Sequence, residues 1–151
     1  NLQNIALEYN FQTFDKLFWE EIERIYVPKT QFIIAGDLNT CLTPADDYSG
    51  KLDPKKPARK PYEIESLKAG ICKFNLHDTF LELNQKCTGE RFTFWSRRYK
   101  GSTNITPARP FGNGLRLDYI FATIQLFTEC YVLDNKSSDH KPVVLVYEEF
   151  D

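Results

Sequence analysis

Two short, uninterrupted apolar runs constrain the fold of this chain more than any other feature of its sequence. They are "FIIA" at residues 32–35 and "VVLV" at residues 143–146. Runs of this length without polar alternation are typical of β-strands that are buried on both faces. A strand buried in this way needs a layer of structure on each side. The sequence therefore predicts a layered α/β fold.

Two helices are predicted from apolar residues at helical spacing. The first covers residues 11–26 and ends before Pro28. Its apolar face is formed by Phe11, Phe14, Leu17, Phe18, Ile22 and Ile25. The second covers residues 62–74. Both helices have charged residues on the opposite face, so we expect them to cover a sheet.

The remaining segments predict further strands and one long loop. β-branched and aromatic residues indicate strands at residues 91–96, 115–122, 128–133 and 142–149. Residues 41–61 are polar and rich in Lys, Pro and Asp, which is typical of a long surface loop. With 151 residues, of which 42% are hydrophobic, the chain has enough apolar surface for the core of one domain.

The charges are distributed unevenly. The net charge of −2 argues against a protein that coats nucleic acid through bulk electrostatics. However, residues 91–117 contain six basic residues and no acidic one, and residues 51–60 contain five basic residues and one acidic one. This clustering favours a local groove for a polyanion, and the alternative is two solvated basic loops.

The cysteines and the apolar content indicate the compartment. The four cysteines form no CxxC pair and none lies near a histidine at metal spacing, so we interpret them as reduced thiols of an intracellular protein. No run of 18 apolar residues and no signal peptide is present, so we expect no membrane partner. The chain lacks methionine and opens on Asn-Leu-Gln, which we interpret as a processed or excised piece.

Polar side chains follow the first predicted strand directly, in "IIAGDLNT". Asp37 and Asn39 have the i, i+2 spacing that places both side chains on the same side of an extended segment. A carboxylate beside an amide can activate a water molecule and bind an oxyanion. The alternative is an Asx-turn or a helix cap.

A second polar group interrupts the apolar segment "LRLDYIF". A carboxylate such as Asp118 within a strand needs a partner, which is either the neighbouring Arg116 or a histidine. The chain has two histidines. His77 has no distinctive setting and is interpreted as structural, whereas His140 lies between Asp139 and the last predicted strand.

Three motifs in this order, "GDLN", "LRLDY" and "SDHKPV", resemble those of the endonuclease/exonuclease/phosphatase superfamily. The segments "ALEYNFQTFDKLF", "RFTFWSRRY" and "ARPFGNGLRLDY" are most similar to class II apurinic/apyrimidinic (AP) endonucleases. The resemblance implies the C-terminal half of a four-layer αββα sandwich, in which two packed mixed or antiparallel sheets are flanked by helices. Residues 1–151 would be a single domain whose N-terminal half is supplied by a second chain or segment.

The resemblance also implies roles for the polar residues. Asp37 would orient or deprotonate the attacking water, and Asn39 would bind a non-bridging phosphate oxygen. His140 would contact the scissile phosphate, with Asp118 fixing its orientation. Asp139 would approach the metal ion, which is Mg²⁺ or Mn²⁺ because hard oxygen ligands favour these ions.

Further residues would contact double-stranded DNA by the same resemblance. Phe94, Leu115 and Leu117 would line the pocket for a flipped-out abasic sugar, since a nucleotide without a base costs little to unstack. The other expected DNA contacts are Asn1, Trp95, Arg97, Arg98, Lys100 and Arg109.

The implied function is Mg²⁺-dependent cleavage of the DNA backbone 5′ to abasic sites, in base-excision repair in the nucleus. Two departures favour an alternative within the superfamily. Leu115 stands where abasic-specific enzymes carry Trp, and the loop at residues 41–61, followed by "YEIESLK", is more like the nicking endonucleases of non-LTR retrotransposons. A phosphoinositide or sphingomyelin phosphodiesterase and a non-catalytic binding domain are the remaining alternatives.

Overall fold

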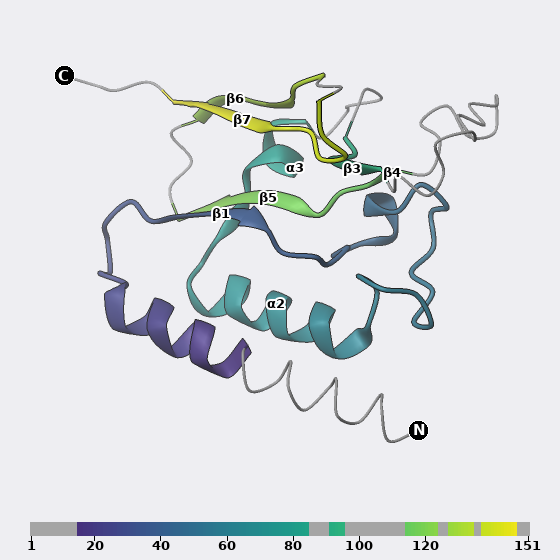
Figure 1. The fold of residues 1–151 in the computed structure, drawn as a ribbon. Coiled ribbons are helices and arrows are strands. Elements are labelled where there is room, and N and C mark those ends of the chain that lie inside the picture. The colour runs from purple at the N-terminus through teal and green to yellow at the C-terminus, as the bar shows by residue number, and fades with distance from the viewer. Residues whose placement is uncertain (1–14, 85–90, 96–113, 124–126, 135–136, 148–151) are drawn as a thin grey trace.

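The computed structural model describes residues 15–84, 91–95, 114–123, 127–134 and 137–147. Figure 1 shows these residues in layers. The first helix, described over residues 15–25, and α2 (Pro61–Lys73) lie side by side on one face of a sheet that contains β1 and β5. The strands β6 and β7 lie on the opposite side of that sheet.

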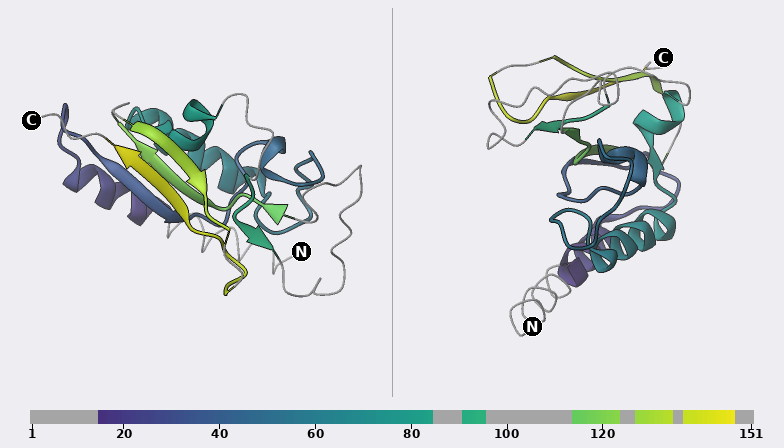
Figure 2. Two further views of the ribbon diagram at one scale, coloured as in Figure 1. Left: turned by 90° about the horizontal axis from the view of Figure 1, so that it is seen from above. Right: turned by 90° about the vertical axis from the view of Figure 1, so that its right-hand side faces the viewer.

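The central sheet is three-stranded and antiparallel, in the order β1-β5-β2. Its strands are β1 (Ile33–Asp37), β5 (Asp118–Ala122) and β2 (His77–Asp78). A short helix, α3 (Thr79–Leu83), follows β2 and contacts both β5 and β6. It therefore lies between the central sheet and the outer strands, as the right-hand view in Figure 2 also shows.

Two smaller antiparallel pairs complete the described strands. The outer pair is β6 (Phe127–Val132) with β7 (Val143–Tyr147), and the other is β3 (Phe94–Trp95) with β4 (Gly114–Leu115). The loop after β1 contains one short 3-10 helix, η1 (Pro44–Asp46). The mixed α/β class with antiparallel sheets and flanking helices agrees with the prediction from the sequence.

The main hydrophobic core lies between the two helices and the central sheet. Alternate residues of β5 point into it, which fits the two-residue period of a strand. The first helix crosses close to α2, where a Cβ atom added to Gly70 would lie 2.1 Å from the ring of Trp19. The buried members of the core are Ile22, Leu42, Leu67, Phe74, Leu76, Tyr119 and Phe121.

The apolar face of the first helix differs from the prediction. Leu17 and Ile25 were predicted to face the core, but they are 60% and 46% exposed. Phe18 and Ile22 pack on the core as predicted, and Trp19, which was not predicted, joins them. Phe11 and Phe14 lie outside the described residues. Trp19 shifts the buried stripe because its ring stacks on the core residue Phe74, at 5.8 Å between ring centroids.

The prediction that β1 and β7 are buried on both faces is wrong for the described residues. Ile33 of β1 is 44% exposed, and Val146 and Tyr147 of β7 are 37% and 54% exposed. In the central sheet β1 is an outer strand, hydrogen-bonded to β5 alone among the described strands. In β1 the face of Ile34 is therefore covered by the core and the face of Ile33 is not, whereas in β7 the exposed residues lie at the end of the strand.

No helix in the described ranges combines the length and the apolar character that a membrane crossing requires.

Candidate active site

Two carboxylates lie directly opposite each other on neighbouring strands of the central sheet. Asp37, the last residue of β1, is paired in register with Asp118, the first residue of β5. Because Tyr119 and Phe121 point into the helix-side core, the alternating residue Asp118 points to the opposite face. Like charges directly opposite each other in a sheet are destabilising. The pair therefore needs a cation or a hydrogen-bond donor beside it.

The imidazole of His140 supplies such a donor. Its Nδ1 atom lies 2.9 Å from Oδ2 of Asp118, and its Nε2 atom lies 3.9 Å from Oδ2 of Asp37. A carboxylate only accepts hydrogen bonds, so Nδ1 carries the hydrogen and Nε2 is directed toward Asp37. All three side chains are partly exposed, which leaves the group accessible from solvent.

The turn after β1 fixes one oxygen of Asp37. The backbone N–H of Asn39 donates to Asp37 Oδ1 at 2.8 Å, which is an Asx-turn. Asn39 has φ 49°, a left-handed conformation that asparagine tolerates better than most residues. Leu38 N also donates to Leu117 O at 2.9 Å, which continues the pairing beyond β1. The predicted Asx-turn and the predicted site therefore occur together, because Oδ1 is held by the turn and Oδ2 faces His140.

The segment that carries His140 is held against β3. Phe94 forms an isolated bridge with His140, and their ring centroids are 4.9 Å apart. Trp95 N donates to the backbone oxygen of Asp139 at 2.9 Å, and Lys141 Nζ lies 4.4 Å from the centre of the Trp95 ring. These contacts place an aromatic side chain directly beside the imidazole.

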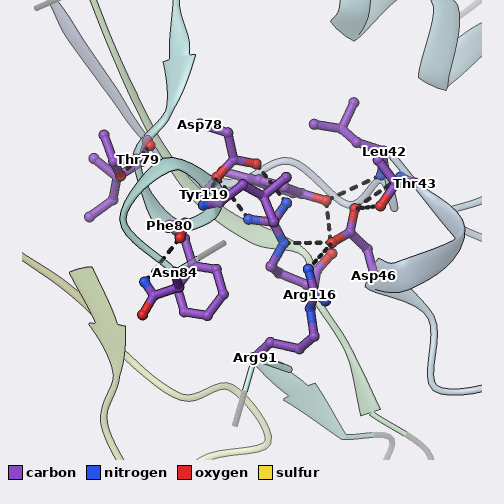
Figure 3. Close-up of polar contacts among 12 residues, drawn as sticks. Leu42, Thr43, Asp46, Asp78, Thr79, Phe80, Asn84, Arg91, Arg116 and Tyr119 are labelled. Carbon is purple, nitrogen blue, oxygen red and sulfur yellow. Dashed lines mark hydrogen bonds and ion pairs between the residues drawn. The ribbon is translucent and has the colours of Figure 1, made fainter. Parts of the chain in front are cut away.

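Arg116 was the alternative partner for Asp118, but the structure pairs it elsewhere. Its Nε donates to Asp46 Oδ1 at 2.7 Å, and its two terminal nitrogens donate to the carboxylate of Asp78 at 2.9 and 2.6 Å (Figure 3). The Arg116 side chain is 1% exposed. Burial alone would lower the pKa of Arg116, but the hydrogen bonds to Asp78 and the charges of both carboxylates raise it. Asp118 is thus left to accept from His140.

This buried network also fixes the loop that follows Asp37. Asp46 Oδ2 accepts from the backbone N–H and the hydroxyl of Thr43, both at 2.9 Å. The hydroxyl of Tyr119 bonds to the carbonyl of Thr40 at 2.7 Å. Burial raises the pKa of Tyr119 well above its ordinary value, so the hydroxyl keeps its proton. The network therefore links the segment after β1 to the start of β5.

The residues predicted to line a substrate pocket lie together. Leu115 and Leu117 are 9% and 3% exposed and form a small buried cluster with Cys41 and Ala58, and the half-buried Phe94 packs against it. Their role toward a substrate stays a prediction.

Two arginines of the basic stretches are engaged in buried ion pairs. Arg59 donates to Asp47 and is 6% exposed, and Arg116 is buried as described above. Neither can contribute to a surface for a polyanion. The exposed basic residues of the described loop are Lys51, Lys55 and Lys56. The remaining predicted DNA contacts Asn1, Arg97, Arg98, Lys100 and Arg109 lie outside the described residues.

The three grouped side chains fit a divalent cation. Asp37, Asp118 and His140 each offer one ligand atom, and these atoms lie within 4.8 Å of one another. Carboxylate oxygens suit Mg²⁺ and Mn²⁺, and a cation would relieve the repulsion between the two carboxylates. Asp139 does not belong to this group of three among the described residues, and its role as a metal ligand stays a prediction.

Comparison with known proteins gives one family and several similar structures. The profile described as "Endonuclease/Exonuclease/phosphatase family" matches residues 6–140. No curated protein matches the chain significantly in sequence. Among solved structures, an AP endonuclease from Leishmania major is similar with a TM-score of 0.75 and 26% identity, over 96% of this chain and 46% of that one.

Two further solved structures share the fold. An AP endonuclease from Archaeoglobus fulgidus has a TM-score of 0.74 and 22% identity, over 94% of this chain and 55% of that one. A 3′-5′ exonuclease from Neisseria meningitidis has a TM-score of 0.67 and 18% identity, over 92% of this chain and 52% of that one. The chain thus spans 46–55% of the length of these three structures.

Proposed function

Because the chain belongs to the endonuclease/exonuclease/phosphatase family, we propose that it forms part of a divalent-metal-dependent phosphodiesterase that cleaves DNA 5′ to abasic sites. One observation carries the proposal: His140 is oriented by Asp118 at 2.9 Å and directs its other nitrogen toward Asp37. The similarity to an AP endonuclease at 26% identity supports abasic DNA as the substrate. We propose in addition that the protein is intracellular and acts in the nucleus.

In this proposal Asp37 acts on the attacking water and His140 acts on the phosphate. Oδ2 of Asp37 orients the attacking water and takes its proton, while Oδ1 stays bonded to the turn at Asn39. The water oxygen forms a bond to phosphorus as the P–O3′ bond breaks, and the leaving oxygen takes a proton from solvent.

The phosphate is held by donors from two segments. The imidazole of His140 donates from Nδ1 to Asp118 and contacts a non-bridging oxygen through Nε2. The side-chain amide of Asn39 donates to the same phosphate. A divalent cation held by the carboxylates of Asp37 and Asp118, together with the predicted ligand Asp139, would supply positive charge where negative charge develops on phosphate.

Phe94 supports a substrate nucleotide that lacks its base. Its ring lies 4.9 Å from the imidazole that contacts phosphate, so an apolar surface lies about one nucleotide from the bond that breaks. A sugar without a base can pack on such a surface, because it has no Watson–Crick edge that needs polar partners.

A nicking endonuclease that recognises DNA shape is the second candidate. The exposed residues Lys51, Lys55 and Lys56 support it. Lysines in a surface loop contact phosphates, and such contacts do not distinguish a nucleotide that carries a base from one that lacks it. Both candidates use the same cleavage chemistry, so they differ only in the DNA that they select.

The choice between them is tested with the complete protein, by which we mean this chain together with the segment that supplies the rest of the family fold. We expect Mg²⁺-dependent incision of a duplex with one abasic analogue, at least about 100-fold faster than incision of the intact duplex. Chelation of the metal should abolish both reactions. Equal rates on the two duplexes would reject abasic specificity and favour the nicking endonuclease, and absence of incision by folded protein would reject both.

We further propose that this chain binds a complementary segment or second chain that forms the N-terminal half of the fold. The support is the outer position of β1 together with the exposed side chains of Ile33, Val146 and Tyr147. An outer strand with exposed apolar residues is a ready template for pairing. A complementary half would cover both the strand edge and these side chains.

The isolated chain should therefore show exposed apolar surface. We expect it to bind a hydrophobic fluorescent dye and to self-associate on a gel-filtration column, because an exposed apolar strand edge favours association. Adding a separately expressed complementary half should remove both properties and give one cooperative melting transition. A monomeric isolated chain that melts cooperatively and does not bind the dye would contradict this proposal.

A further inference from the structure

Thr93 is a wholly buried residue that lies between the two segments carrying Asp118 and His140. It precedes β3 and is 0% exposed. We propose that Thr93 is a positioning residue, whose hydroxyl and backbone together hold the Asp118–His140 pair in the geometry needed for catalysis. The inference rests on the proposed function, and it adds a residue that does not contact the substrate.

The hydroxyl of Thr93 binds the backbone on one side of the pair. Its Oγ1 atom lies 3.0 Å from Leu117 N and 3.1 Å from Asp118 N, and it accepts from both. These two amides lie at the junction between β4 and β5, where residues 116–117 belong to neither strand. One hydroxyl oxygen has two acceptor positions, so a single side chain satisfies both amides and fixes the backbone from which the Asp118 carboxylate projects.

The backbone of Thr93 binds the other side of the pair. Its carbonyl accepts from Lys141 N, the residue after His140, at 2.7 Å. Its N–H donates to Leu115 O at 2.9 Å. One residue is therefore bonded directly to the segment of Asp118 and directly to the segment of His140.

The neighbouring residues strengthen this link but do not replace the hydroxyl. Phe94 and Trp95 hold the His140 segment on β3 through the isolated bridge and the bond to Asp139 O. They set the position of His140 relative to β3, whereas the hydroxyl sets the position of Asp118 relative to the same strand. The 2.9 Å bond between Nδ1 and Oδ2 depends on both, and a displacement of about 1 Å can cost about 100-fold in rate.

Valine is the informative replacement, because it keeps the branched shape of threonine and removes the acceptor. We expect Thr93→Val in the complete protein to lower the single-turnover rate of DNA cleavage about 10- to 100-fold and to leave DNA binding unchanged. Thr93→Ser keeps the hydroxyl and should restore the rate. The rates are measured below the unfolding temperature of every variant. Under that condition, loss of a purely structural residue would not lower the cleavage rate while leaving DNA binding unchanged.

The matched control is Thr79→Val. Thr79 is also buried, at 2% exposure, and its hydroxyl donates to the backbone of the same strand at Ile120 O, 2.8 Å away. The substitution removes a comparable buried hydroxyl bonded to β5, but that hydroxyl bonds neither to the amides of Leu117 and Asp118 nor to the segment of His140. We expect it to lower stability and to leave the cleavage rate per folded molecule unchanged.

A second readout does not depend on cleavage. The chain has two histidines, so in the NMR spectrum of a His77→Gln variant the remaining imidazole Nδ1–H resonance belongs to His140. We expect Thr93→Val to shift or broaden this resonance, and we expect Thr93→Ser and Thr79→Val to leave it as in the parent. This readout tests the inference even if the complete protein cleaves no DNA, so failure of the inference and failure of the proposed function are distinguishable.

An unchanged His140 resonance in folded Thr93→Val would overturn the inference. If Thr93→Val does not fold, Thr93→Cys takes its place, since a thiol is only a weak acceptor. The inference then requires an altered resonance in Thr93→Cys, and a resonance identical to the parent contradicts it.

Discussion

Replacing Arg116 by methionine should destabilise the complete protein by about 3–5 kcal/mol, the range found when one partner of a buried ion pair is removed. Asp46 is 0% exposed and the Asp78 side chain is 14% exposed, so the variant would leave two largely buried carboxylates without their main cation. Arg116→Lys should lie between the parent and Arg116→Met, because an ammonium group keeps the charge but cannot bond to both carboxylates as a planar fork does. Urea unfolding of the three proteins measures the effect.

The control for this prediction is Arg24→Met. Arg24 also bonds to a carboxylate, that of Glu21 at 2.5 Å, but both side chains are exposed. We expect the unfolding midpoint of this variant to match that of the parent, because exposed pairs are screened by water. Converting Asp46 and Asp78 to Asn in the Arg116→Met background should recover part of the loss, since it removes the unpaired charges. An Arg116→Met protein as stable as the parent would contradict the structural role of the network.

Local sequence signals predicted the elements that have their own pattern. Helix α2 was predicted from the spacing of its apolar residues at residues 62–74, and it spans Pro61–Lys73. Proline at its first position, Glu63 in its first turn and Lys73 in its last turn are helix-terminal signals that agree with these bounds. The strands β2 and β3 span two residues each, which is too short to show a period. Consequently β2 was not predicted, and β3 was predicted longer than it is. The short helix α3 was also not predicted.

The apolar runs predicted strands correctly but their environment incorrectly. A run such as "FIIA" shows that both faces of a strand are apolar, and it does not show which element covers each face. In β1, Ile34 packs on the helix-side core, whereas Ile33 on the other face is 44% exposed. The sequence therefore indicated the need for a second layer that the described residues of this chain do not provide.

The grouping of Asp37, Asp118 and His140 was predicted from the order of three motifs, but the residues that support it were not. The partners of Arg116 lie 70 and 38 residues away in the sequence, so no local pattern connects them. Thr93 gave no signal because a threonine within an aromatic strand is common. A clue existed for Asp46, since the segment Thr-Pro-Ala-Asp has the spacing of a helix-capping box.

In the proposed mechanism Asp118 orients His140 for phosphodiester cleavage. Replacing Asp118 by asparagine keeps the shape of the side chain but removes the charged acceptor of the Nδ1 hydrogen. An asparagine amide can donate to Nδ1 instead of accepting from it, so the imidazole loses the anionic acceptor that fixes its orientation toward the phosphate. Because the change also removes one of two opposed carboxylates, we expect no loss of folding stability.

The decisive measurement is the single-turnover rate of Mg²⁺-dependent cleavage of abasic DNA by the complete protein and its Asp118→Asn variant. We predict a fall of about 10²- to 10⁴-fold in the variant, at unchanged DNA affinity. The control is Asp134→Asn, which removes an exposed carboxylate that pairs with Lys141, next to His140, and it should cleave at the parent rate. A folded Asp118→Asn protein that cleaves as fast as the parent would contradict the assignment of this site.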